Sequence, residues 1–190
     1  MNTQPTKKVK VALLGDAGVG KSSIVQRIFR NEFYEFQEAT IGAAYMVMTR
    51  DDTRLECWDT AGQERYRSLI SMYTRSADVV WLVVDASDEN RQEQIDYWIQ
   101  TVKNSIPETA TIVRIINKVD LVRERPLMYR RENSPVFYTS AKTGEGCDEL
   151  LEYTFTKTVS NTGDNNKTVH RISIGSVEPP PPNSYCCSVQ

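Results

Sequence analysis

The sequence has few of the features that would indicate a nucleic-acid partner or a membrane span. Its 190 residues carry a formal net charge of −2 and contain no basic stripe, so we expect no nucleic-acid partner. No apolar run approaches the length of a membrane span, the polar N-terminus has no hydrophobic signal region, and no internal repeat is present. With 39% hydrophobic and 25% charged residues, the composition is that of a soluble globular protein.

Cysteine is scarce as well, and its placement does not suggest a disulfide framework. Cys57 lies in a strand-like segment and Cys147 in a helix-like one, whereas Cys186 and Cys187 are adjacent near the C-terminus. Because no secretory signal is evident, we expect a reducing compartment and free thiols.

A glycine-rich stretch at residues 15–23 is the most informative segment that the sequence does contain. It fits the pattern G-x-x-x-x-G-K-[S/T], between a strand-like segment at 9–14 and helical apolar spacing at 24–29. Such a loop aims backbone N–H groups at a polyphosphate, and the following helix adds its positive N-terminal dipole. Lys21 is expected to contact the β- and γ-phosphates and Ser22 to reach Mg²⁺. The alternative, a glycine turn without a ligand, is disfavoured by the flanking strand and helix.

Strand-like and helix-like segments alternate along the chain. The run at 79–84 is almost wholly apolar, as expected of a strand buried on both faces of a sheet, and apolar residues at 95, 98, 99 and 102 predict an amphipathic helix. The pattern predicts an α/β fold: a six-stranded, mostly parallel sheet with helices on both faces and its site at the carboxyl ends of the strands. We expect strands near 9–14, 41–49, 53–58, 79–84, 112–116 and 136–139, and helices near 23–29, 95–102 and 147–155.

The domain organisation follows from changes in composition. We expect a flexible N-terminus at 1–7, a single domain at 8–158 and a flexible tail at 159–190, which is rich in Ser, Thr, Asn, Pro and Gly. Residues 31–40 mix polar and aromatic side chains without a clear period, so we interpret them as a functional loop.

Further polar motifs follow three of the predicted strands. Asp-Thr-Ala-Gly-Gln-Glu occupies 59–64, Asn-Lys-Val-Asp occupies 117–120, and Ser-Ala-Lys occupies 140–142. Together with the phosphate loop and the threonine at position 40, these motifs resemble the five nucleotide-binding motifs of the Ras superfamily of small GTPases, in order and at suitable spacing. Over residues 8–158 the chain resembles the Rab family, and the strings at 35–44 and 58–66 look most like its early-endosomal branch.

The resemblance implies a guanine-nucleotide switch with a set of named roles. Thr40 and Ser22 would contact Mg²⁺, Asp59 would hold the ion through water, the Gly62 N–H would bond the γ-phosphate, and Gln63 would orient the attacking water. Asp120 would accept two N–H bonds from guanine. The implied nucleotide-binding residues are Asp16, Ala17, Gly18, Val19, Gly20, Lys21, Ser22, Ser23, Thr40, Gly62, Asn117, Lys118, Asp120, Ser140, Ala141 and Lys142.

The resemblance also implies a surface for partners. Tyr45, Trp58 and Tyr73 match the aromatic triad that Rab proteins present to effectors; the alternative is plain core packing. The implied partners are an exchange factor, a GTPase-activating protein, a GDP-dissociation inhibitor and effectors, and we expect a monomer.

Several positions depart from the family pattern. Ala17 stands beside the expected γ-phosphate where relatives carry Gly or Ser, Ile116 replaces a common Gly, and Gln92 replaces a common Phe. The 121–135 segment is too short for the family's usual helix, so we expect a turn or two, or no helix. The family more often carries Phe where this chain has Tyr45.

The last five residues are Cys186-Cys187-Ser-Val-Gln, which is similar to the double-cysteine terminus of Rab proteins. Two geranylgeranyl chains are therefore implied, since one lipid alone gives marginal membrane binding. Between 159 and 190 the formal charges cancel, so no polybasic patch replaces the second lipid. The expected location is the cytoplasmic face of endomembranes, the early endosome above all, with cycling through the cytosol.

Two other functions are compatible with part of this pattern. One is a scaffold locked to GTP with little hydrolysis, which Gln63 opposes and Ala17 slightly favours. The other is a P-loop kinase acting on a small metabolite, which the guanine-reading motif and the lack of an arginine-rich lid oppose.

Overall fold

A computed structural model describes residues 5, 7–62, 69–127 and 134–159 of the chain, with side chains described to residue 156. Six strands form one sheet in the order β2-β3-β1-β4-β5-β6. All neighbouring strands pair in parallel except β2 and β3, which form an antiparallel hairpin. The strands are β1 (Lys7–Leu14), β2 (Ala43–Arg50), β3 (Thr53–Thr60), β4 (Val79–Asp85), β5 (Thr111–Asn117) and β6 (Val136–Tyr138).

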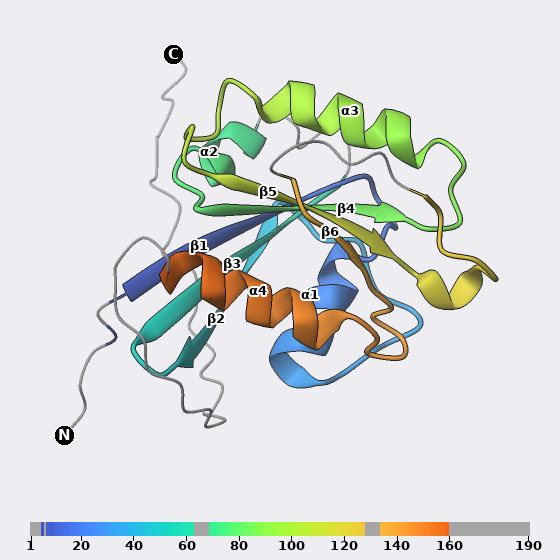
Figure 1. The fold of residues 1–190 in the computed structure, drawn as a ribbon, viewed down its shortest axis with the longest axis horizontal. Helices are drawn as coiled ribbons and strands as arrows, with labels where there is room; N and C mark the ends of the chain where they lie inside the picture. The colour runs from blue at the N-terminus through green and yellow to red at the C-terminus, as the bar shows by residue number, and fades with distance from the viewer. Residues whose placement is uncertain (1–4, 6, 63–68, 128–133, 160–190) are drawn as a thin grey trace, which may run out of the picture.

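Within the described residues, four α-helices cover the two faces of the sheet. Helices α1 (Lys21–Arg30) and α4 (Cys147–Val159) lie against one face, and α2 (Ile70–Thr74) and α3 (Arg91–Val102) lie against the other (Figure 1). The six-stranded, mostly parallel sheet with helices on both faces confirms the fold predicted from the sequence.

Alternation of side chains along the strands creates two separate cores. Val9, Val11 and Leu13 of β1 pack toward α1 and α4, whereas Ala12 and Leu14 pack toward α2 and α3. Because strand residues alternate between the two faces, one strand supplies both cores. Strand β4 is buried along nearly its whole length, in line with its apolar sequence.

Two segments could not be assigned firmly from the sequence: helix α2 and the 121–135 segment. Helix α2 was not anticipated, because its five residues are too few to show a helical period. After the short 3₁₀ turn η2 (Val119–Leu121), the described residues 122–127 and 134–135 contain no helix. Residues 128–133 lie outside the described residues, so the expected shortening of the 121–135 segment stays a prediction. In the described part of the chain, no helix combines the length and the apolar character that a membrane crossing requires.

Candidate functional site

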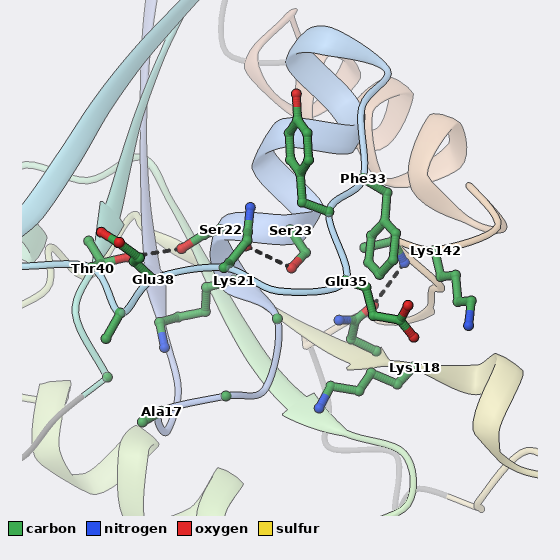
Figure 2. A pocket seen from close by; sticks show the side chains of 18 of the residues that line it. Ala17, Lys21, Ser22, Ser23, Phe33, Glu35, Glu38, Thr40, Lys118 and Lys142 are labelled. Atoms are coloured by element: carbon green, nitrogen blue, oxygen red, sulfur yellow. Dashed lines mark hydrogen bonds between the residues drawn. The ribbon is translucent and has the colours of Figure 1, made fainter.

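One cavity of about 450 Å³ opens beside the carboxyl ends of β1, β3 and β5, and its volume is in the range of small-molecule sites. Figure 2 shows Ala17 and Lys21 of the phosphate loop near Thr40, with Lys118 and Lys142 at the far end of the same cavity. Of the residues predicted from the sequence, it collects Ala17, Gly18, Gly20, Lys21, Ser22, Ser23, Thr40, Gly62, Asn117, Lys118, Asp120, Ala141 and Lys142. Four predicted residues are not among the lining residues, although each adjoins one in the sequence: Asp16, Val19, Asp59 and Ser140.

The phosphate loop presents a buried cation and an uncapped helix end. Lys21 is only 6% exposed, and its Nζ donates to the carbonyl oxygens of Gly15 at 2.9 Å and Asp16 at 2.8 Å. Burial lowers the pKa of Lys21 to about 8, although Asp59 and Asp16 oppose the shift. Helix α1 starts at Lys21 without a side-chain cap and with no acid in its first turn. A bound anion would satisfy the N–H groups and offset the desolvation of the lysine.

Three oxygen-bearing side chains converge beside this helix end. The Ser22 hydroxyl donates to Oδ2 of Asp59 at 2.5 Å and lies 3.0 Å from the Thr40 hydroxyl oxygen. Burial raises the pKa of Asp59, while the Ser22 hydrogen bond and the charge of Lys21 oppose the rise. Oδ1 of Asp59 is buried and makes no hydrogen bond among the described residues. An unsatisfied carboxylate oxygen beside two hydroxyls fits a hard divalent cation such as Mg²⁺.

The buried side chain of Asn117 connects the two ends of the cavity. Its side chain is 1% exposed; Nδ2 donates to the Val19 carbonyl oxygen at 2.9 Å, and Oδ1 accepts from the Thr139 hydroxyl and the Ala141 N–H. This residue therefore ties the phosphate loop to the segment at 140–142. Its contacts are structural, and they position the backbone that would face a nucleotide.

The far end of the cavity carries the groups suited to reading a base. Asp120 is exposed, and its Oδ1 accepts a hydrogen bond from the Ser140 hydroxyl at 2.5 Å. Because Asp120 is exposed, its carboxylate is accessible to donors on a ligand. Lys118 adopts a left-handed conformation, with φ 64°, and its Nζ lies 2.7 Å from Oδ2 of Asp85. Burial alone would raise the pKa of Asp85, but hydrogen bonds from Lys118 and Ser87 outweigh it and lower that pKa.

Gly62 approaches the phosphate loop closely. A Cβ atom there would lie 2.5 Å from the backbone of Asp16 and 2.5 Å from Nζ of Lys21, so a larger residue would displace the loop. Gln63, the predicted water-orienting residue, lies outside the described residues, and so do Cys186 and Cys187.

The structure adds contacts that the sequence patterns did not reveal. The Asp16 carboxylate turns away from the cavity and accepts a hydrogen bond from Nε1 of Trp98, on α3, at 3.0 Å. Phe33, Glu35 and Gln37 of the 31–40 loop line the cavity as well. The composition of the loop indicates a functional segment, but its lack of a period does not show which of its residues face a ligand.

The predicted aromatic surface forms a continuous row. The ring centroids of Tyr45 and Trp58 lie 4.7 Å apart, and those of Trp58 and Tyr73 lie 5.4 Å apart. All three side chains are half-buried, and none belongs to either hydrophobic core. Plain core packing therefore does not account for them.

The positions that depart from the family pattern differ in their surroundings. Ala17 is exposed at the cavity. Ile116 is fully buried and packs in the core beneath α3, so it acts as an ordinary strand residue. Gln92 is half-buried, and its Nε2 donates to Oδ1 of Asp96 one turn later on α3 at 3.2 Å.

Comparisons with known proteins agree with this geometry. Residues 10–120 match the family model described as the Ras of Complex, Roc, domain of DAPkinase, which places the domain among Ras-type GTPases. The chain is 40% identical over 167 residues to GTP-binding protein ypt5 of Schizosaccharomyces pombe, which covers 79% of each protein. It is 38% identical over 161 residues to Ras-related protein Rab-5A of Dictyostelium discoideum, which covers 79% of this chain and 80% of the relative. The chain belongs to the Rab family of small GTPases.

Proposed function

We propose that this chain is a GTP-dependent switch that binds GTP and GDP with Mg²⁺ in the 450 Å³ cavity and slowly hydrolyses GTP. The observation that carries the proposal is the gathering of a phosphate loop, a hydroxyl–carboxylate cluster and a base-reading end around one cavity. Residues 8–158 form the nucleotide-binding domain in this proposal, and 159–190 form its tail. Membership of the Rab family argues against the P-loop kinase interpretation.

The roles of the phosphate end follow from its contacts. Lys21 exchanges its two carbonyl partners for the β- and γ-phosphates, and the first N–H groups of α1 face the same oxygens. Ser22, Thr40 and Asp59 would hold Mg²⁺, which neutralises charge developing on the phosphates. Gln63 orients the attacking water. A trans-acting arginine raises Ras-type rates about 10⁵-fold, so slow turnover without a partner is expected.

The switch itself rests on the loops that meet the γ-phosphate. Among the described residues, the Thr40 hydroxyl forms hydrogen bonds with the Ser22 hydroxyl and with Asp59, and a phosphate and a metal ion would add further contacts that order it. Loss of the γ-phosphate would release Thr40 and Gly62 together. The row of Tyr45, Trp58 and Tyr73 begins on the strand that follows Thr40, which makes it the effector surface in this proposal.

The relatives named ypt5 and Rab-5A support a role in endocytic vesicle transport. In this proposal the protein acts at the cytoplasmic face of the early endosome and cycles through the cytosol. Geranylgeranylation of Cys186 and Cys187 would supply the membrane anchor, and the tail would keep the switch clear of the bilayer. A GDP-dissociation inhibitor would then extract a monomeric protein, while exchange factors, activating proteins and effectors act on the switch face. Membrane loss in the Cys186→Ser, Cys187→Ser double variant, with nucleotide binding intact, would test the anchor.

The base assignment is tested by replacing Asp120 with Asn. Asparagine donates where the carboxylate accepts, so the variant should prefer xanthine, which carries an acceptor where guanine has a donor. Calorimetry with GDP, XDP and ADP on both proteins measures the change. Equal affinity of the wild type for ADP and GDP would refute the assignment.

Hydrolysis is tested by replacing Gln63 with Leu, which keeps a similar volume but removes the amide. Single-turnover hydrolysis should slow by about tenfold or more while GTP affinity changes little. The same assay on the wild type separates a hydrolysing switch from a GTP-locked scaffold, because a scaffold would show no turnover in either protein.

A further inference from the structure

A single arginine on α1 bonds to two loops that belong to opposite ends of the cavity. Nε of Arg27 donates to the Ala141 carbonyl oxygen at 2.8 Å, and its Nη2 donates to the Lys142 carbonyl oxygen at 2.9 Å. Its Nη1 donates to the backbone oxygen of Asn31 at 3.1 Å and to that residue's Oδ1 at 3.2 Å. Arg27 itself does not line the cavity.

The geometry of these bonds requires a guanidinium. Arginine carries donors in a rigid planar fork, so Nε and Nη2 can meet two successive carbonyls while Nη1 points to a third. A lysine keeps the charge, but its three donors sit on one nitrogen and cannot span the same acceptors. Arg27 is half-buried, so its bonds are partly shielded from competing water.

The 140–142 end of this linkage leads to the base-reading carboxylate. Ser140 precedes the two carbonyls that Arg27 binds, and its hydroxyl donates to Asp120. The same hydroxyl oxygen accepts the Thr143 N–H at 3.1 Å, which closes the turn around it. A shift of the Ala141–Lys142 backbone would therefore move Ser140 and release Asp120.

The Asn31 end leads to the loop that covers the phosphates. Asn31 ends α1 in a left-handed conformation, with φ 58°, and the 31–40 segment starts there. That segment carries Gln37 and Thr40, which both line the cavity. Arg27 thus sets where the loop leaves the helix.

We propose that Arg27 is a positioning residue that holds Asp120 in register for the 2-amino group of guanine while it anchors the first residue of the 31–40 loop. The role rests on the proposed function, because it presumes that Asp120 reads the base. Hypoxanthine lacks the 2-amino group, so the preference for GDP over IDP depends on where Asp120 stands. A misplaced carboxylate loses that preference even when the phosphates bind as before.

The test compares Arg27→Ala and Arg27→Lys with Arg30→Ala, which removes an exposed arginine from the last turn of the same helix. Competition against fluorescent GDP gives the affinity of each protein for GDP and IDP. We expect both Arg27 variants to bind GDP about tenfold more weakly and to lose about fivefold of the GDP-over-IDP preference. The Arg30 variant should match the wild type.

The ratio separates positioning from general destabilisation. A loss of affinity that is equal for GDP and IDP would overturn the proposal, and so would a lysine variant that behaves as the wild type does. Equal binding of GDP and IDP by the wild type would instead refute base reading by Asp120, and the role of Arg27 would fall with it.

Hydrogen exchange supplies a second readout if the alanine variant does not fold. In GDP-loaded Arg27→Lys, amide exchange should rise both at 31–34 and at 140–144, which are far apart in the sequence. A rise confined to α1, or a rise at only one of the two segments, would contradict a residue that positions both.

Discussion

The base-reading end of the cavity and the 31–40 loop enclose the same space but are built differently. Asn117 and Ser140 are at most 1% exposed, and hydrogen bonds connect them to the phosphate loop and to Asp120. In the 31–40 loop and just beyond it, Phe36 is 93% exposed and Ile41 is 82% exposed. One side is buried and hydrogen-bonded before any ligand arrives, whereas the other is largely exposed and is joined to the domain by a few partly exposed hydrogen bonds.

The position of each side in the sheet explains the difference. The base-reading motif follows β5, which is buried from Val113 to Asn117 and paired on both edges. The 31–40 loop leads into β2, an edge strand whose residues are only partly buried. Local stability follows such burial, so a ligand can reorder the loop without disturbing the base site. A switch needs both properties in one cavity.

We call the base-reading end of the cavity the fixed side, because it is buried and hydrogen-bonded without a ligand. The largest expected effect comes from replacing a glycine on this side. Gly20 has φ +95°, and a Cβ there would lie 2.3 Å from Nδ2 of Asn117. Gly20→Ala should therefore lower the free energy of unfolding by about 3 kcal/mol, through strain and the displaced asparagine together. Urea unfolding of the nucleotide-free protein measures the loss.

Gly42, beyond the loop, is the matched control for this change. Its φ is +70°, but a Cβ there would meet no atom within 4 Å. Gly42→Ala should therefore cost only the conformational strain, about 1 kcal/mol. If the two variants lost the same free energy of unfolding, the fixed side would accommodate a new side chain as readily as the loop does. The contrast between the two sides would then be wrong.

A smaller effect is expected in the 31–40 loop. The Ser23 hydroxyl donates to Oε1 of Gln37 at 3.1 Å, which draws the loop toward the start of α1. One partly exposed hydrogen bond contributes about 1 kcal/mol, so Gln37→Ala should raise amide exchange across 31–40 by about fivefold with GDP affinity nearly unchanged. Glu35→Ala, at an exposed neighbouring position, is the control. A rise of exchange at 140–144 as well would show that the two sides are not independent.

The parts of this architecture that repeat locally could be predicted from the sequence. Three local patterns predict the conformation of the segments that contain them. They are the apolar run of β4, the helical spacing around Ile95 and Trp98, and the glycine pattern of the phosphate loop. The segments predicted to hold the site do meet around one cavity, because parallel strands end at a common edge.

The remaining features depend on contacts between distant segments. The hydrogen bonds from Trp98 to Asp16 and from Arg27 to Ala141 join residues 82 and 114 positions apart. No periodicity encodes such pairs, since they arise only when the strand order is set. Helix α2 could not be predicted for a local reason, because its five residues are too few to show a helical period.

The smallest expected effect concerns the ion pair of Asp85 and Lys118, which adds to the fixed side at the end of β4. Because the pKa of Asp85 is lowered in the folded protein, its contribution to stability is present above the unfolded pKa, near 3.8, and is lost as the pH falls through the folded value. Allowing for solvent screening of a partly exposed pair, Asp85→Asn should cost about 0.5 kcal/mol at pH 7 and less near pH 3, which lies below the unfolded pKa.

The measurement is urea unfolding of wild type and variant at both pH values, with the difference between the two proteins compared. Ser87→Ala is the control, because it removes the hydroxyl that donates to Oδ1 of Asp85 at 2.7 Å but leaves both charges in place. From pH 7 to pH 3, the Ser87→Ala variant should lose most of the free energy of unfolding that the wild type loses over the same range. If Asp85→Asn instead destabilised the protein equally at pH 7 and pH 3, the pair would act through packing, and charge would have no part in fixing this end of the cavity.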